Sequence, residues 1–239
     1  MSNKLFQSVI LIFLFTSSAM YAQQAWHRIS PLPQENTINE ITAIPGSDRL
    51  IAVCEGSTIM TSDDVGESWA LMLNPAGRDN QYICKGVHFI NETTGFINGG
   101  KETILKTTDG GLNWNLKYTG NTSYTWQCIN DVVFRTGIHG FAVGDHGKLM
   151  ETNDAGESWH VVESGVQGNL QQIVFADSLT GFIFQENITC LKTIDGGLSW
   201  NAEPLADNIP DGTFYDCLFT NPLTGFIFIN EYSPTESTG

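Results

Sequence analysis

The sequence predicts an all-β fold built from four similar units and part of a fifth, and three observations support this prediction. First, an eight-residue phrase, Ser/Thr-x-Asp-x-Gly-x-x-Trp, occurs four times, and its tryptophans are 45, 45 and 41 residues apart. Second, an apolar residue stands 18 residues before each of these tryptophans. Third, each unit holds four short runs of β-branched and aromatic residues without a helical period. A period of this length with four strands matches one blade of a β-propeller, which buries its faces against its neighbours.

The spacing inside each unit is constant. We call the repeated phrase the box; its acidic and aromatic members are Asp64 and Trp69, Asp109 and Trp114, Asp154 and Trp159, and Asp195 and Trp200. The apolar residues upstream of the tryptophans are Ile51, Phe96, Phe141 and Phe182. Glycine precedes the three phenylalanines, and another phenylalanine lies seven residues before each of them. Phe219 and Gly225-Phe226 continue this spacing, so a fifth unit begins after the fourth box.

The third unit illustrates the expected strands. Runs at 131–134, 141–143, 148–152 and 159–162 predict four strands, and the box forms the hairpin between the last two. The predicted blades are 41–73, 84–118, 129–163, 170–204 and a partial blade at 214–239, with an N-terminal strand at 25–30 to pair with it. Because the fifth box is missing, we expect a truncated propeller, or a ring that closes incompletely at five blades.

The box has a structural role that requires no ligand. A short carboxylate in a hairpin accepts hydrogen bonds from the backbone of its own turn. The glycine two residues later allows a conformation that a side chain disfavours, and the tryptophan covers the hairpin. We therefore expect the box carboxylates to be structural.

This phrase resembles the Asp-box, or bacterial neuraminidase repeat, of sialidases, xyloglucanases, sortilin-type receptors and photosystem II stability/assembly factor-like propellers. The stretch from Gly140 to Trp159 is most similar to a blade of the last group, and the resemblance covers roughly residues 26–230. It implies a propeller whose boxes lie away from the active face. A sialidase needs an arginine cluster to clamp a carboxylate, whereas this chain has only Arg28, Arg49, Arg78 and Arg135. This shortage argues against sialidase activity and against the basic client-binding patch of the assembly factors.

Residues 1–22 have the pattern of a signal peptide, with Lys4 before an apolar run and small residues before Gln23. The run is too short to span a bilayer. The prediction is an exported propeller domain at 23–239 that is secreted, periplasmic or at the cell surface, with no stable membrane span after cleavage.

Charge and cysteines narrow the function further. The formal net charge of −15 disfavours nucleic acid and anionic lipid as partners. Five cysteines leave at least one unpaired, and Cys190 replaces an aliphatic residue of the other units, so we expect it to be buried. No cysteine or histidine spacing indicates a metal site. We predict neither a metal nor a cofactor.

The candidate site lies on the loop face opposite the box hairpins. Its candidate ligand-binding residues are aromatic or polar: Arg78, Tyr82, Tyr124, Trp126, Phe214, Tyr215 and His146. The preferred hypothesis is a binding or scaffold module without catalysis that recognises a protein or carbohydrate partner and self-associates through its incomplete last blade. The alternative is a secreted glycoside hydrolase of the sialidase or xyloglucanase-like type that uses Asp131 and Asp216 as acid and base.

Overall fold

The computed structural model describes residues 36–72, 84–120, 126–187, 189–203, 212–221 and 224–231. In these ranges the regular secondary structure is β-strand, apart from two single 3-10 turns, η1 (Glu55–Ser57) and η2 (Asp145–Gly147). The predicted all-β class is therefore confirmed. The signal peptide at 1–22 and the strand at 25–30 lie outside the described residues.

The strands form five antiparallel sheets, each made of strands that are consecutive along the chain. The first sheet contains β1 (Ile38–Ala43), β2 (Leu50–Cys54), β3 (Thr58–Ser62) and β4 (Ala70–Met72). The second contains β5 (Cys84–Phe89), β6 (Gly95–Gly99), β7 (Thr103–Thr107) and β8 (Asn115–Tyr118). The third contains β9 (Ile129–Phe134), β10 (Gly140–Gly144), β11 (Leu149–Thr152) and β12 (His160–Val162). The fourth contains β13 (Leu170–Phe175), β14 (Gly181–Gln185), β15 (Cys190–Thr193) and β16 (Asn201–Glu203), and the fifth contains β17 (Gly212–Asn221) and β18 (Thr224–Glu231).

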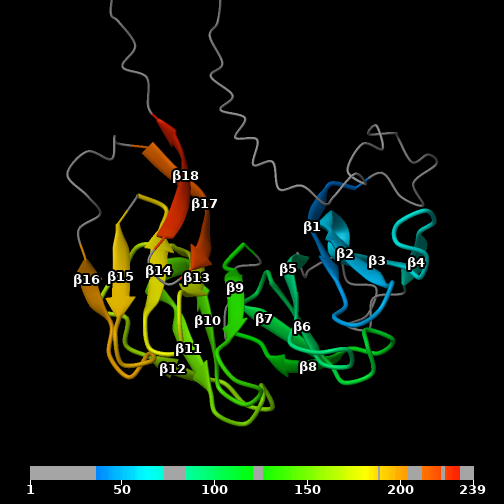
Figure 1. Ribbon diagram of the computed structural model, residues 1–239, viewed down its shortest axis with the longest axis horizontal. Helices are drawn as coiled ribbons and strands as arrows, with labels where there is room; N and C mark the ends of the chain where they lie inside the picture. Colours follow the sequence, from blue (N-terminus) through cyan, green and yellow to red (C-terminus); the bar gives the residue numbers. More distant parts are fainter. Residues whose placement is uncertain are drawn as a thin grey trace, which may run out of the picture. The chain divides into compact units, whose positions relative to one another are not determined.

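Each sheet is a blade of a β-propeller, as predicted. Figure 1 shows the strands of each blade side by side in chain order, which is the up-and-down arrangement expected of short hairpin connections. In the described part of the chain, blades one to four have four strands and blade five has two. The box lies in each case between the third and fourth strands.

The glycine before each second-strand phenylalanine makes room for a ring. Gly95 pairs across the strands with Phe89, and a Cβ on Gly95 would lie only 2.7 Å from that ring. Gly140 has the same relation to Phe134, and Gly181 to Phe175. The constant seven-residue spacing thus records a cross-strand pair in which the aromatic ring covers the glycine.

The core lies between successive blades. Ile51, Val53 and Ile59 of blade one pack with Val87, Ile97 and Trp114 of blade two. The same arrangement joins blade two to blade three and blade three to blade four. Between blades four and five, Phe184 and Cys190 pack with Phe214 and Cys217. A single blade buries neither face alone, so the blades stabilise one another.

The five cysteine side chains are buried as thiols. Cys190 is 1% exposed in the core between blades four and five, as predicted from its position in the repeat. Burial raises the pKa of Cys84 and of Cys217 to about 12, so these thiols are protonated at neutral pH.

Candidate functional site

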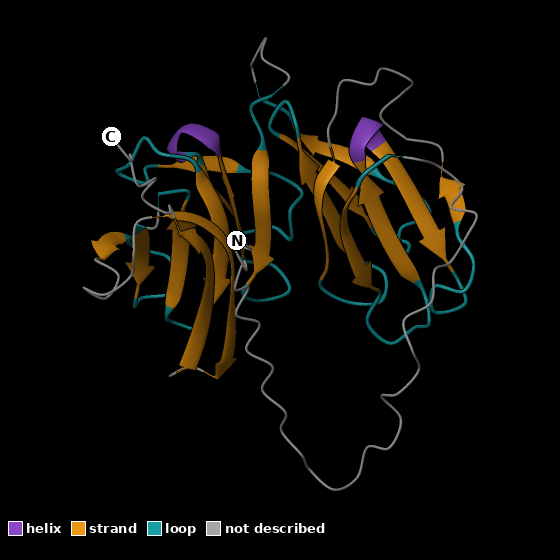
Figure 2. Cartoon of the chain, turned by 90° about the horizontal axis from the view of Figure 1, so that it is seen from above, coloured by secondary structure: helices purple, strands orange, loops and turns teal. Residues whose placement is uncertain are grey.

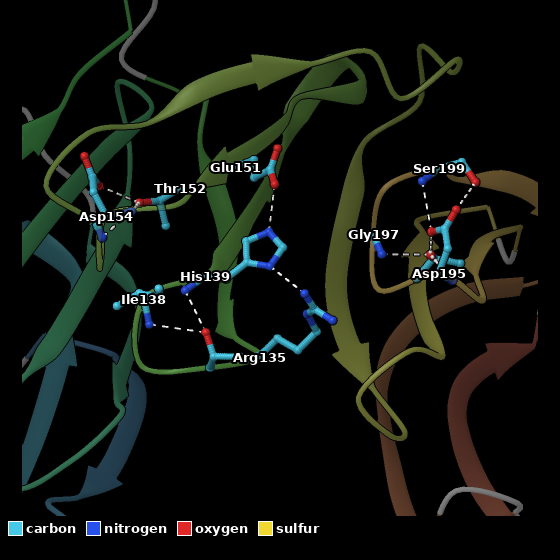
Figure 3. Close-up of polar contacts among 12 residues, drawn as sticks. Arg135, Ile138, His139, Glu151, Thr152, Asp154, Asp195, Gly197 and Ser199 are labelled. Carbon is cyan, nitrogen blue, oxygen red and sulfur yellow. Dashed lines mark hydrogen bonds and ion pairs between the residues drawn. The ribbon is translucent and has the colours of Figure 1, made fainter.

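The four boxes share one hydrogen-bonded turn. In the second box, Gly111 N donates to Thr107 Oγ1 at 2.9 Å, and Asn113 N donates to Asp109 Oδ1 at 2.9 Å. Thr107 Oγ1 in turn donates to Asp109 Oδ1, while Asn113 Nδ2 donates to Oδ2. Figure 3 shows the fourth box, in which Ser199 N donates to Asp195 Oδ1 and Ser199 Oγ donates to Oδ2.

These bonds explain the chemistry of the box carboxylates. Hydrogen bonds from Ser158 and Thr152 hold the pKa of Asp154 below its usual range, and those from Ser199 and Thr193 do the same for Asp195. The glycines have positive φ, +83° at Gly111 and +79° at Gly156, as the turn requires. The arrangement holds a hairpin together and leaves the carboxylate ionised within its own turn.

The structure places the predicted ligand-binding residues as follows. Trp126 is 56% exposed, and its ring centroid lies 5.7 Å from that of His146, with 52° between the two planes. Tyr215 on β17 is 68% exposed. The prediction that Phe214 binds ligand is wrong, because this residue is buried. It is 4% exposed, and its ring stacks on Phe184 in the core with 4.9 Å between the ring centroids. The other three candidates, Arg78, Tyr82 and Tyr124, lie outside the described residues.

The turn that carries His146 is held by its neighbours. His146 N donates to Asn169 Oδ1 at 3.1 Å, and Gly147 N donates to the Gly168 carbonyl at 2.8 Å. The buried Asp145 carboxylate accepts bonds from Cys128 N at 2.9 Å and Asn130 Nδ2 at 3.0 Å. His146 has a φ of +57°, an unusual value for a residue other than glycine. Figure 2 draws the two 3-10 turns, η1 and η2, in purple.

Asp131 and Asp216 occupy the same position on the first strand of their blades. This position, which we call the inner slot, is defined by the residue paired with it on the second strand. The five pairs are Glu40 with Val53, Gly86 with Asn98, Asp131 with Val143, Gln172 with Phe184, and Asp216 with Phe228. A β-bulge adjoins the slot in every blade. Bulges re-aim side chains, so the slot residues share one orientation.

The inner slot ties each blade to the next one. Glu40 Oε2 accepts a bond from Val87 N at 2.8 Å, Asp131 Oδ2 from Ile173 N at 2.9 Å, and Gln172 Oε1 from Cys217 N at 2.8 Å. In blade two the slot holds Gly86, and the side chain of Asn98 fills its space. Asn98 Nδ2 donates to the Ile129 carbonyl at 3.1 Å instead.

The slot carboxylates lie close enough to influence one another. Burial raises the pKa of Asp131 to about 7; bonds from Ile173 N and Val132 N oppose this shift, and the charges of Glu40 and Asp216 add to it. Burial also raises the pKa of Glu40, against the bond from Val87 N. Both oxygens of Asp131 accept backbone N–H groups: Oδ1 accepts from Val132 in its own strand, and Oδ2 accepts from Ile173 and so ties β9 to β13.

Sequence reasoning missed Glu40 as a slot residue. The register pairs Ala43 with Leu50 in blade one, but Phe134 with Gly140 in blade three, so the first hairpin loop is one residue longer. Counting back from the box therefore gives Ile41 instead of Glu40. No residue type in the sequence marks this shift.

A second polar group lies at the box end of blade three. Arg135 Nη2 donates to His139 Nδ1 at 2.8 Å, and His139 Nε2 donates to Glu151 Oε1 at 2.7 Å (Figure 3). Since arginine can only donate, Nδ1 is the acceptor and His139 is the neutral Nε2–H tautomer. Arg135 Nη1 also donates to the Ser178 carbonyl of blade four at 2.7 Å. The group ties the loop 135–139 to the next blade.

A hollow of about 190 Å³ lies at the same end of blades one and two. It is lined by Ile44, Ser47, Arg49, Glu92, Thr93, Asp109 and Gly110. Arg49 is held there by Asp63 at 2.6 Å and by the Gly110 carbonyl at 2.7 Å. Within the described ranges, no group of three or more histidine, cysteine, aspartate or glutamate side chains is placed to hold a metal ion.

The chain matches no protein-family model and no curated protein. Among solved structures it is similar to the GH74 enzyme of Niastella koreensis (16% identity, TM-score 0.58, 75% of this chain and 31% of that chain). It is also similar to an ancestral GH74 enzyme (19% identity, TM-score 0.59, 72% of this chain and 25% of that chain). A third match is YCF48 bound to D1 peptide (16% identity, TM-score 0.47, 84% of this chain and 92% of that chain).

The likenesses to the two GH74 enzymes show the fold. The class of protein is a β-propeller, and this chain spans about a third or less of the length of the GH74 enzymes it matches. In the part of the chain that the structure describes, no helix is long and apolar enough to cross a membrane.

Proposed function

We propose that this protein is an exported binding scaffold that recognises a protein or carbohydrate partner through the loop face opposite its boxes. The observation that carries the proposal is the Trp126–His146 pair: a largely exposed indole lies at a tilt beside an imidazole whose turn is held by bonds from neighbouring loops. Exposed aromatic rings on a fixed backbone bind sugars and peptide side chains at low entropic cost. Tyr215 adds a third exposed ring on the first strand of blade five.

The test is binding to glycan and peptide arrays by the wild-type chain, Trp126→Ala and His146→Ala. A matched control is Val161→Ala, since Val161 is 58% exposed on β12 and lies outside the loop face. We expect the two loop-face variants to lose at least about tenfold in affinity for the selected ligand, with unchanged melting temperature, and the control to bind normally. Equal binding by all four proteins would refute this face as the recognition site.

Glycoside hydrolysis is the second candidate, and one observation favours it. A carboxyl group with a pKa of about 7, near a second carboxylate, is the pair that an acid and base mechanism requires. The test is turnover of artificial aryl glycosides by the wild type, Asp131→Asn and Asp216→Asn. Turnover that both variants abolish, while folding is retained, would replace the scaffold proposal with the hydrolase. We expect no turnover, because both Asp131 oxygens already accept backbone N–H groups, Oδ1 from Val132 in its own strand and Oδ2 from Ile173 of the next blade.

Export and self-association are also part of the proposal. Export rests on the signal pattern of residues 1–22, and N-terminal sequencing of the mature protein should begin near Gln23. Self-association through the last blade is supported by Leu218, Phe226 and Phe228, which are 48–55% exposed on β17 and β18. Light scattering should show a dimer that Phe228→Lys disperses; a monomer at high micromolar concentration would contradict this part.

A further inference from the structure

Three exposed aliphatic side chains surround the box turn of blade four. Ile194 lies two residues before Gly196 and Leu198 two residues after it. Gly196 N donates to the Leu179 carbonyl at 2.9 Å, which brings the third side chain to the same turn. Leu179 is 53% exposed, Ile194 71% and Leu198 83%. We call these three residues the box patch. Contiguous exposed apolar side chains rimmed by polar groups are typical of interaction surfaces.

The other blades place different residues at the three positions. The backbone bond to the first position recurs in blades one to four; in blade one it joins Val65 N to the Asp48 carbonyl. The box spacing defines the other two positions. The equivalent residues are Asp48, Asp63 and Glu67 in blade one, Thr93, Thr108 and Leu112 in blade two, and Ile138, Asn153 and Glu157 in blade three. Each of them is exposed. The fold therefore accepts a carboxylate at all three positions and does not require the aliphatic set of blade four.

The exposure of the box patch is a property of these turns. Ile138 holds the position of Leu179 in blade three, where blade four follows it, and it is 62% exposed. Leu112 holds the position of Leu198 in blade two, between blades one and three, and it is 60% exposed. The residues at the position of Ile194 are exposed as well. Neighbouring blades on both sides thus leave these positions open to solvent.

The backbone beneath the patch is held by hydrogen bonds. Asp177 Oδ1 accepts from Leu179 N at 2.8 Å and from Thr180 N at 2.7 Å. Arg135 Nη1 of blade three donates to the Ser178 carbonyl at 2.7 Å, so the same turn is also tied to the preceding blade. The box carries the bonds common to all four boxes. A surface that is ordered before binding loses less conformational entropy when a partner covers it.

Two carboxylates that stay ionised at neutral pH lie in the turns of the patch. Backbone N–H groups of the 177–180 turn hold the pKa of Asp177 below its usual range. The box bonds do the same for Asp195. Arg135 packs against Gly196, but its guanidinium already donates to a carbonyl and to His139. Apolar side chains beside fixed negative charge favour a partner that brings positive charge.

We propose that the box patch binds a polypeptide segment of another protein, in which apolar side chains are flanked by lysine or arginine. The apolar side chains cover Leu179, Ile194 and Leu198, and the cations lie beside Asp177 and Asp195. A second copy of this chain fits less well, because a symmetric contact brings like carboxylates together. The net charge of −15 disfavours an anionic lipid surface. This site is separate from the loop face and does not depend on that proposal.

The test uses the full chain to select from a phage library of random peptides of about 12 residues. The library is first depleted on a patch variant, Leu179→Thr/Ile194→Thr/Leu198→Gln, which gives blade four polar residues as in the other blades. We expect the enriched peptides to combine two or more apolar residues with lysine or arginine. A synthetic peptide of the enriched sequence should bind the wild type saturably in fluorescence anisotropy, and the patch variant at least about tenfold more weakly.

Two further variants show whether position and charge matter. The matched control is Leu71→Thr/Leu116→Gln/Val161→Thr, which replaces three aliphatic residues that are 50–58% exposed on the fourth strands of blades one to three. It should bind the peptide as the wild type does. Asp177→Asn keeps an acceptor oxygen for the turn and removes the charge, so it should weaken binding about two- to fivefold at low salt. Melting curves should show that all variants are folded.

Several results would overturn the proposal. They are the absence of any peptide that survives depletion, enrichment of peptides without lysine or arginine, and an equal loss of affinity in the control and patch variants. Binding of the wild type but not the patch variant to phosphatidylcholine vesicles would assign the patch to a lipid surface instead. A dimer that the patch variant disperses would assign it to a second copy. Trp126→Ala should bind the peptide normally, which separates this proposal from that of the loop face.

Discussion

Replacing Gly156 by alanine tests whether the box glycine is required by its conformation alone or also by the ring of the preceding blade. Gly156 has a φ of +79°, and a Cβ there would lie 2.8 Å from Cζ of Phe96. Gly165 is a matched control, because its φ is +77° and no atom lies within 4 Å of the Cβ position. The two substitutions impose the same backbone strain, and only the first also imposes a clash.

The expected magnitudes follow from these two terms. An alanine in the left-handed region costs about 1–2 kcal/mol, so Gly165→Ala should lower the free energy of unfolding by that amount. Overpacking a closed site adds about 1–3 kcal/mol. Gly156→Ala should therefore lose about 2–5 kcal/mol in total, and melt lower by about 2–4 °C per kcal/mol for a chain of this size.

The assay is urea unfolding followed by tryptophan fluorescence and circular dichroism. Phe96→Leu in the same background provides a double-mutant cycle, in which the smaller side chain should recover part of the loss caused by Gly156→Ala. Equal losses for Gly156→Ala and Gly165→Ala, or additive effects in the cycle, would refute the steric argument and leave conformation as the sole requirement.

Three further predictions concern the ties between blades. Trp114→Ala should lower the free energy of unfolding by about 3–5 kcal/mol, and Asp109→Ala should lower it by about 1–3 kcal/mol because turn donors are left unpaired. Chemical denaturation measures both losses. An Asp109→Ala variant that keeps its stability but loses an activity would show that the box is functional. Asn98→Val should lower the free energy of unfolding by about 1–3 kcal/mol, because the bond to the Ile129 carbonyl is lost. Adding Gly86→Asp should recover part of this loss, since the pair then matches Asp131 and Val143 of blade three. A double variant no more stable than Asn98→Val would contradict the role of the slot as a tie. The pKa of Asp131 is about 7 in the folded chain and about 4 when the chain is unfolded, so the folded state binds this proton more tightly. The contribution of this proton to the free energy of unfolding is therefore complete below about pH 4 and is lost as the pH rises to about 7. Asp131→Asn should abolish that fall in urea titrations between pH 4 and 7, and an identical slope in both proteins would contradict the assignment.

The blade architecture could be predicted because its signals are local and repeated. The box, the glycine under a first-strand phenylalanine and the residue 18 positions before the tryptophan report contacts that recur in most of the blades. The contact of Gly156 with the Phe96 ring of the preceding blade also explains why glycine is needed for space as well as for its positive φ, which spacing alone could not show. At this position the ring of the preceding blade leaves room only for glycine.

The site was less predictable because it depends on register and on burial between blades. Glu40 was missed because the loop before Leu50 is one residue longer than in the other blades, which shifts the count back from the box. The bulge beside each slot also changes the direction of a side chain, and no residue type marks it in the sequence. Phe214 was expected on the loop face, but it is the last blade's contribution to the core with Phe184. By contrast, Trp126 and His146 lie on exposed turns, where local sequence is informative.

The contacts at the two ends of the blades run in one direction along the chain. At the inner slot, the side chain of one blade accepts an N–H from the blade that follows, as Asp131 does from Ile173. At the box end, an apolar residue on the second strand of one blade is covered by the box of the blade that follows, as Phe141 is by Gly197 and Trp200. Each blade therefore depends for its burial on the blade that follows it.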